Sequence, residues 1–331
     1  MKTRASKKKP SSRRAVYAAL IGNLLVAATK SVAAAVSGSS SMLSEAVHSL
    51  VDCGNEVLLL YGQNRAARRP DVEHPFGYGR ELYFWSFVVA LLIFALGAGV
   101  SIYEGVLHML EPEPIRNPII NYAVLALAFV FEGGSWIVSF RQFRAASGKN
   151  ELYDAFVRSK DPPSFMVLFE DSAALLGIVF AALGTFAAST LDMPRMDGVA
   201  SVLIGLVLAG VAMLLARESK SLLIGEPAER ELVDSILKDA AGVRGVVRAN
   251  GALTSHLSPD DIVLSLSLEF EDRLCVPELE EVVLEIERIV REEHPQVLSL
   301  FVKPQTPRAF NEARRARFEQ GEEDATAMPN R

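Results

Sequence analysis

Residues Ser41–Gly62 read SMLSEAVHSLVDCGNEVLLLYG, a mostly apolar stretch that also carries Glu45, His48 and Asp52. On a helix, residues four apart lie one above the other, so His48 and Asp52 share a face and Glu45 lies close to it. If this helix crosses a bilayer, each ionisable side chain costs at least about 2.5–3.5 kcal/mol unless it meets a partner, a cavity or an ion. The face is therefore a candidate functional site. The alternative is a soluble core helix with one satisfied histidine.

The composition of the whole chain favours the membrane interpretation. Of its 331 residues, 50% are hydrophobic and the mean hydropathy is +0.22, yet 22% are charged, so the two properties must occupy different segments. The net charge of −6 combines a basic N-terminus with an acidic C-terminal third, which argues against a nucleic-acid partner. The two cysteines, Cys53 and Cys275, lie too far apart in sequence to predict a disulfide framework or a cysteine-based metal site.

Six apolar segments are each long enough to cross about 30 Å of hydrocarbon, which takes roughly 20 residues. They cover residues 15–37, 42–63, 82–109, 119–143, 165–190 and 197–216, of which the second and fifth are the least apolar. Lysine and arginine concentrate in the N-terminal arm and in the second and fourth connections. Because cytoplasmic loops are enriched in these residues, both termini of this multi-pass protein are predicted to be cytoplasmic. We expect it in the bacterial inner (plasma) membrane.

Four regions follow from these patterns. They are a basic cytosolic arm (1–14), a six-helix transmembrane domain (15–217), a cytosolic α/β domain (218–303) and a charged tail predicted to be disordered (304–331). In the third region, hydrophobic periodicity predicts a helix over 228–239, strands over 243–250 and 261–270, a helix over 276–294 and a strand over 297–303. The predicted fold is thus a polytopic α-helical membrane protein, a six-helix bundle followed by a small domain of αββα type.

Converging imidazole and carboxylate groups predict a site for a divalent transition metal, because these are its preferred ligands beside thiolates. His48 and Asp52 supply one of each from the second segment, and Glu170 and Asp171 stand together in the fifth. Adjacent helical residues point about 100° apart, so at most one of this pair faces the site squarely. We expect Asp171 to be that residue.

Several separated blocks carry a family resemblance. They are SMLSEAVHSLVDCGNE at 41–56, HPFGYGRE at 74–81, the Asp in the fifth segment, DGVASVLIGLVL at 197–208 and ESKSLLIGE at 218–226. In order and spacing they resemble the cation diffusion facilitator family, over nearly the whole chain to about Lys303. The resemblance implies a homodimeric antiporter without a prosthetic group, in which two ligands from the second helix and two from the fifth hold the metal while inward proton flow drives export.

Three positions match the ligands that the resemblance implies, namely His48, Asp52 and Asp171. The position four before Asp171 holds Val167, where zinc-transporting members usually have His or Asp. The candidates to complete the metal's ligand shell are Glu170, Glu45, Asn55 or a water molecule.

Two further polar residues are secondary candidates. Glu132 is either a carboxylate that faces the cavity or part of a close helix crossing at Gly133 and Gly134. His74 is either a ligand at the metal's entrance or part of a turn before the third helix.

These observations predict efflux of a divalent cation, Zn²⁺ or one of Mn²⁺, Fe²⁺ and Co²⁺, by proton antiport across a lipid membrane. A metal-ligating His must be neutral, and its ordinary pKa of about 6.5 lets metal and protons compete around neutral pH. The rival hypothesis is a membrane metal sensor or interaction scaffold that transports nothing, which the unusual Val167 keeps open. An enzyme, such as a metallohydrolase, is disfavoured because no nucleophile or general base accompanies His48.

Overall fold

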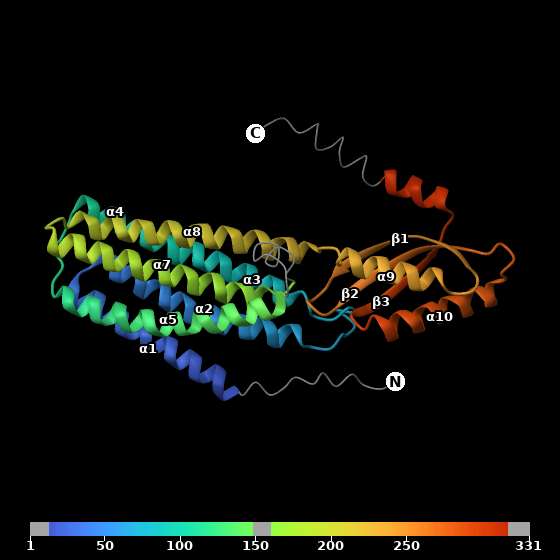
Figure 1. The fold of residues 1–331 in the computed structure, drawn as a ribbon, viewed down its shortest axis with the longest axis horizontal. Coiled ribbons are helices and arrows are strands. Elements are labelled where there is room, and N and C mark those ends of the chain that lie inside the picture. Colours follow the sequence, from blue (N-terminus) through green and yellow to red (C-terminus); the bar gives the residue numbers. More distant parts are fainter. Residues whose placement is uncertain (1–12, 148–159, 317–331) are drawn as a thin grey trace. The chain divides into compact units, whose positions relative to one another are not determined.

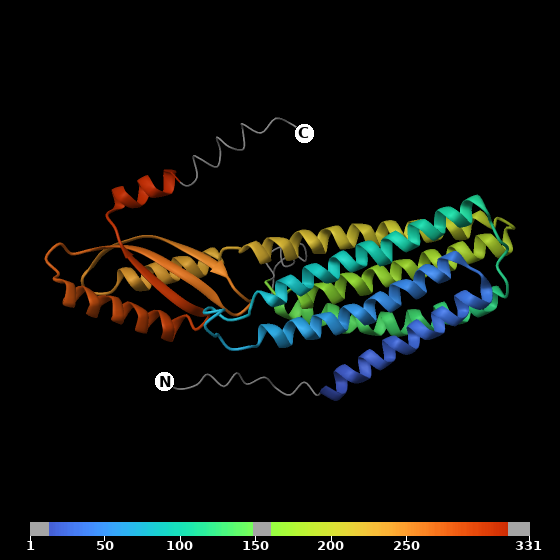
Figure 2. The same cartoon turned by 180° about the vertical axis from the view of Figure 1, so that it is seen from behind.

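The computed structural model describes residues 13–147 and 160–316, which divide into two compact units. The first comprises the described residues of Met1–Ala67 and Glu81–Ser221, and the second those of Arg68–Arg80 and Leu222–Arg331. Figures 1 and 2 show the first unit as a bundle of long helices and the second as a small sheet with helices beside it. The predictions made for residues 1–12, 148–159 and 317–331 lie outside the described residues.

The first unit has a long helix in each of the six predicted segments. The helices are α1 (Arg13–Ser37), α2 (Ser40–Ala66), α3 (Glu81–Leu92) with its continuations η1 (Ile93–Ala98) and α4 (Gly99–Leu110), α5 (Pro118–Ser147), α7 (Pro162–Thr190) and α8 (Arg195–Ile224). The π-helical turn η1 lies inside the third predicted segment, so α3, η1 and α4 together form one span. Among the described residues, four stretches are long and apolar enough to cross a membrane: Glu81–Leu110, Pro118–Ala145, Phe165–Thr190 and Arg195–Ile224.

The two remaining helices differ from these four in composition. The helix α2 has 27 residues but too many charged and polar side chains to qualify as a span by composition, and the described apolar part of α1, Asn23–Ser37, is short. Their membrane crossing therefore stays a prediction. The fifth segment, expected to be weak, does qualify, because Glu170 and Asp171 are its only charged residues between 165 and 190.

The helix α2 lies at the centre of the bundle. It packs against α1, α3, η1, α4 and α7, while α5 packs against α1 and α7. Small side chains make this possible, and Ser44, Ala46 and Ser49 of α2 are all buried. The polar face of α2 is therefore turned toward other helices, which is the arrangement that a polar site inside a membrane requires.

A buried carboxylate from another helix caps the N-terminus of α2. Asp197, in the first turn of α8, is fully buried, and its Oδ2 accepts hydrogen bonds from the backbone N–H groups of Ser40 at 2.6 Å and Ser41 at 3.3 Å. The hydroxyl of Ser39 donates to Asp197 Oδ1 at 2.8 Å. The first N–H groups of a helix lack partners within the helix and attract negative charge. Asp197 thus fixes the start of α2 and ties α2 to α8, a contact that the sequence pattern did not predict.

Replacing Asp197 by Ala is expected to destabilise the protein by about 1–3 kcal/mol, because buried N–H groups of α2 lose their acceptor. Asp197→Asn keeps one acceptor oxygen and should cost less. Thermal unfolding in detergent, followed by circular dichroism, measures both, with Glu113→Ala on an exposed loop as the control. An unfolding midpoint of Asp197→Ala equal to that of Glu113→Ala would contradict the capping role.

The second unit contains all five elements predicted for the α/β domain. They are α9 (Arg230–Ala241), β1 (Val246–His256), β2 (Ile262–Phe270), α10 (Val276–Glu293) and β3 (Val297–Pro304). The strand β1 pairs antiparallel with β2, and β2 pairs parallel with β3. The predicted first strand ended at Asn250, six residues early. Register shifts on either side of Ala249 explain the error, since bulges interrupt the period-two pattern by which a strand is recognised.

The core of the second unit lies between the sheet and the two helices. Leu264, Leu266 and Leu268 of β2 are fully buried against Ile236 of α9 and Ile286 of α10. The alternation of leucine and serine in β2 therefore places leucine on the helix side, as expected for a half-buried strand.

One helix lies within the tail that was predicted to be disordered. Residues 307–316 are helical, and Arg308 pairs with Glu312 one turn on at 2.9 Å. Phe310 packs on Gly251 of β1 so closely that a side chain at Gly251 would collide with the Phe310 ring. A single aromatic contact and a local ion pair thus order a stretch whose composition alone indicates disorder.

Candidate metal centre

A small, partly open cavity lies between α1, α2, α5 and α7. Its volume is about 40 Å³, enough for one ion or water molecule. The residues that line it are Asn23, Ser49, Asp52, Glu56, Glu132, Ser135, Val167, Glu170 and Asp171. Five carboxyl side chains thus meet one cavity inside a bundle of apolar helices. Such a density of acids needs cations for balance.

The helix α2 brings His48 and Asp52 together as the four-residue spacing predicted. The His48 Nδ1 and Asp52 Oδ1 atoms lie 3.4 Å apart, and Asp52 lines the cavity. His48 is buried beside Asp52 but is not among the residues that line the cavity. Neither ring nitrogen of His48 has a hydrogen-bond partner among the described residues. The imidazole is therefore close to the acids and free to act as a ligand.

Both acids of the pair on α7 line the cavity, and each is held from a different side. Asp171 Oδ2 accepts hydrogen bonds from the hydroxyls of Ser135 at 2.9 Å and Ser139 at 3.2 Å, both on α5. Glu170 Oε1 accepts a hydrogen bond from the amide of Asn55 on α2 at 2.9 Å. The expected angle between adjacent helical residues thus directs one acid toward α5 and the other toward α2. Both acids nevertheless line the cavity, although we had expected only one of the pair to face the site squarely.

Val167 also lines the cavity, one turn before Asp171. The position at which the family resemblance implies a fourth ligand is therefore on the wall of the cavity and is apolar. Asn55, another candidate for that role, uses its amide N–H on Glu170, while its Oδ1 lacks a hydrogen-bond partner among the described residues.

Sequence reasoning missed four residues of the cavity wall, namely Asn23 on α1, Ser49 and Glu56 on α2, and Ser135 on α5. Glu56 lies one turn beyond Asp52, and its Oε1 accepts a hydrogen bond from the Asn23 amide at 2.6 Å. The signal was available, since 48, 52 and 56 follow the same four-residue spacing on α2. Asn23 on α1 had no such signal.

The two secondary acids have different environments. Glu45 is buried and does not line the cavity, because its Oε2 pairs with Lys30 at 3.0 Å. Glu132 does line the cavity and lies 3.7 Å from the same Lys30 amino group. Apart from the local backbone of α5, no described atom lies within 4 Å of a Cβ built at Gly133 or Gly134, so the alternative of a close helix crossing there is not supported.

His74 belongs to the loop 68–80, which is part of the second unit. Its ring packs on that of Tyr78 at 4.2 Å between centroids, and its backbone N–H donates to Asp71 Oδ1 at 2.8 Å. The Tyr78 hydroxyl donates to the other oxygen of Asp71, which lowers the pKa of that carboxyl. Gly77 has a φ of 83°, which few other residues adopt. This geometry fits the interpretation of His74 as part of a turn.

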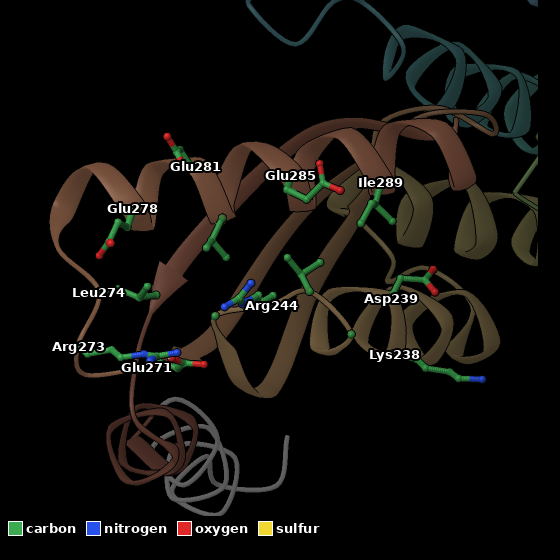
Figure 3. A pocket seen from close by; sticks show the side chains of 14 residues that line it. Lys238, Asp239, Arg244, Glu271, Arg273, Leu274, Glu278, Glu281, Glu285 and Ile289 are labelled. Atoms are coloured by element: carbon green, nitrogen blue, oxygen red, sulfur yellow. The ribbon is translucent and has the colours of Figure 1, made fainter.

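The second unit has a larger groove of about 1040 Å³ beside α9 and α10. Figure 3 shows Glu281 and Glu285 along α10, with Arg244 and Arg273 on loops below that helix in the view. The charges are mixed and no histidine lines this groove. His294 Nε2 lies 2.7 Å from Oδ2 of Asp239, which lines the groove, and His256 Nδ1 lies 3.1 Å from the backbone oxygen of Ser258. The groove therefore lacks the features of a metal site.

No group of three His, Cys, Asp or Glu side chains in the described ranges is already arranged to hold a metal ion. The donors around the cavity instead bind serine, asparagine and lysine. Loading an ion would require Asn55 and the hydroxyls of Ser135 and Ser139 to release or share their carboxylates. A small rearrangement of this kind suits an ion that enters and leaves, in contrast to a permanently held cofactor.

Comparison with known proteins relates the bundle to metal transporters. Residues 16–224 match the family model of the cation efflux transmembrane domain. The proton-coupled zinc antiporter SLC30A9 of Xenopus laevis mitochondria is 36% identical over 63% of this chain and 38% of its own length. The metal tolerance protein C4 of Arabidopsis thaliana is 34% identical, over 80% of this chain and 58% of its own. The manganese efflux system protein MneP of Bacillus subtilis is 22% identical, over 79% and 86%. The chain thus spans only 38% and 58% of the first two relatives.

Proposed function

The chain belongs to the cation diffusion facilitator family, and on this premise we propose that it carries a divalent transition-metal ion across a membrane in exchange for protons. It is a multi-pass membrane protein, and its named relatives are a zinc antiporter, a metal tolerance protein and a manganese efflux protein. The observation that carries the proposal is the cavity with five carboxyl side chains inside the apolar bundle. Acids in such a place bind cations or protons, and an exchanger needs both.

We assign the ion to Asp52 and Asp171, with His48 and Glu170 completing its ligands. Asp52 and Asp171 line the cavity from α2 and α7, and His48 can reach it through a change of side-chain conformation beside Asp52. Ligands must lose their protons to bind metal, so loading the ion expels protons from the same side chains. Exposure of the cavity to the two sides in turn would make this competition an exchange, and no separate proton path is needed.

The chemistry of the cavity favours a broad choice of metal. Carboxylates suit Mn²⁺ and Fe²⁺, while a second imidazole would favour Zn²⁺ or Co²⁺. Val167 stands where that second imidazole would project from α7. We therefore propose that this chain accepts Mn²⁺ or Fe²⁺ as well as Zn²⁺ and Co²⁺.

Replacing Val167 by His is expected to raise the preference for Zn²⁺ over Mn²⁺ by about 10–100-fold, because it adds a nitrogen ligand to the wall of the cavity. The measurement is proton release into or from proteoliposomes, read by a trapped pH-sensitive dye, with each metal in turn. Val167→Leu, which adds volume but no ligand, is the control. Equal effects of His and Leu would show that the position acts by size alone.

The same metal panel tests the proposed function itself. Proton flux that depends on the metal in wild-type vesicles supports exchange. If no metal moves protons while metals still bind the protein in detergent, the chain is a sensor or scaffold. That rival agrees with the absence of a preassembled group of ligands in the described residues. The relatives' names describe transport and not catalysis, and we propose no enzymatic reaction.

Three further features belong to the proposal. We propose that both termini lie in the cytoplasm, which the distribution of lysine and arginine in the connections supports. We propose the bacterial inner membrane as the location. We also propose a homodimer, supported by half-exposed apolar side chains on both edge strands of the second unit, Leu253 of β1 and Phe301 of β3.

A further inference from the structure

Lys30 of α1 is a buried cation next to the acidic cavity. Its side chain is 0% exposed, and its amino group lies 3.0 Å from Glu45 Oε2 and 2.8 Å from the hydroxyl of Ser49, both on α2. The same amino group lies 3.7 Å from Glu132 Oε1 on α5. Of these partners, Ser49 and Glu132 line the cavity, whereas Glu45 does not. Lys30 thus lies between Glu132, which lines the cavity, and Glu45, which is buried but does not line it.

The ionisable groups that line the cavity are all acidic. Among the described residues, Lys30 is the only lysine or arginine within 4 Å of any of the five carboxyl side chains that line the cavity. Several ionised acids in a membrane interior are costly unless cations or protons neutralise them. A transported divalent ion compensates them only while it is bound. The carrier must also exist without metal, and in that state Lys30 is the cation that remains.

Glu45 can hold the Lys30 amino group away from the acids that line the cavity. Its Oε2 already pairs with Lys30, while its Oε1 has no hydrogen-bond partner among the described residues. Oε1 points at Gly177 of α7, where a larger side chain would collide with it. The second oxygen is thus kept both buried and unpaired. The flexible side chain of a lysine can shift by the small distance between two acids that it already contacts.

We propose that Lys30 is a positioning residue for the transported ion, a resident cation that balances the acidic cavity when the metal is absent and weakens the hold on the metal when it is present. An ion arriving between Asp52 and Asp171 is repelled by the Lys30 amino group, which stays paired with Glu45 at 3.0 Å. When the ion leaves, the same positive charge, 3.7 Å from Glu132, balances the acids and prevents the empty cavity from holding the next ion too tightly. This inference rests on the proposed function, because it concerns the same cavity.

A salt bridge that merely fastens α1 to α2 is the alternative, and it predicts different kinetics. If Lys30 only fastens helices, Lys30→Met should lower transport and weaken or leave unchanged the apparent affinity for metal. The proposal instead predicts that the apparent affinity for metal rises while the rate of transport falls. Without the resident cation, Lys30→Met should bind Zn²⁺ and Mn²⁺ at least about tenfold more tightly and turn over at least about tenfold more slowly, the size typical of coupling between two sites.

The experiment measures KM and the maximal rate of Zn²⁺ and Mn²⁺ transport in proteoliposomes for a set of variants. Lys30→Arg keeps the charge and should stay within about threefold of wild type, as rescue by a cation requires. The double variant Lys30→Met with Glu45→Gln removes both members of the buried pair without leaving either charge alone. The proposal expects it to keep the lowered KM and lowered rate, because Glu132 still lacks its cation. Return of both parameters to wild-type values in the double variant would overturn it.

Folding and function are separated by two additional measurements. If Lys30→Met does not give folded protein, Lys30→Gln replaces it, because glutamine can still hydrogen-bond to Ser49 and Glu45. The same lowered KM and lowered maximal rate are expected. Should wild-type vesicles move neither metal, the transport proposal fails, while the role of Lys30 is still decided by titrating Zn²⁺ into detergent-solubilised protein. A Kd for Lys30→Met at least about tenfold below that of wild type supports the inference, and an equal or higher Kd overturns it.

Discussion

Asp52→Asn and Asp171→Asn proteins are expected to fold as the wild type does and to lose metal-dependent proton flux by more than about 100-fold, since even residues behind the metal ligands cost 10–100-fold in affinity. Asparagine has nearly the shape of aspartate, so the Ser135 and Ser139 hydroxyls can still donate to an oxygen at position 171. The charge is what the substitution removes. A neutral amide neither compensates a divalent ion nor exchanges a proton, so both halves of the exchange fail together.

The control for this prediction is Asp192→Asn. Asp192 is exposed and has a φ of 55°, a conformation in which asparagine is well tolerated. Flux and thermal stability should therefore match the wild type. Wild-type flux in both Asp52→Asn and Asp171→Asn would remove the basis for placing the ion in this cavity.

His48→Leu is expected to separate stability from function. Both ring nitrogens of His48 are buried without hydrogen-bond partners, a situation that costs about 1–3 kcal/mol. Leucine fills a similar volume without polar atoms, so the metal-free variant should be as stable as the wild type or more so. Metal binding should fall by at least about tenfold, because a neutral imidazole is the only nitrogen ligand proposed for the ion.

Thermal unfolding in detergent measures both parts of this prediction. The wild type should gain stability on addition of Zn²⁺, by about 2.7 kcal/mol at 100 times the Kd, and His48→Leu should gain little at the same concentration. A metal-free His48→Leu protein that is clearly less stable than the wild type would show that the histidine serves the packing of α2. A metal-induced gain that equals that of the wild type would show that it is no ligand.

Helical periodicity and hydropathy predicted the long helices of the bundle well, because both properties are local. Each of the six predicted segments contains a helix, and the bounds differ by a few residues except for α8, which continues to Ile224. The π-helical turn Ile93–Ala98 was not foreseen, since its composition resembles that of an α-helix. Beyond the bundle, the bulges in β1 and the helix over 307–316 were missed, since each depends on contacts between segments.

The candidate site was predictable in part for the same reason. His48 and Asp52 could be placed together because one helix carries both, and the acids of α7 stood out as charges in an apolar run. Which acids share a cavity depends on how the helices cross, so the sequence analysis named Glu45 and missed Glu56, although Glu56 continues the spacing of His48 and Asp52. The structure places Glu56 at the cavity and Glu45 on Lys30. Asp197 was missed because its partners, Ser39–Ser41, lie more than 150 residues away in the chain.

The central claim is that one acidic cavity exchanges a divalent metal for protons. The most direct test loads wild-type protein into vesicles that are acidic inside, adds Zn²⁺ or Mn²⁺ outside, and follows internal metal and internal pH together. We predict that metal accumulates inside above its external concentration while the internal pH rises, and that a protonophore that collapses the gradient ends the accumulation. Metal that does not enter, or that enters equally with and without the proton gradient, would contradict the claim.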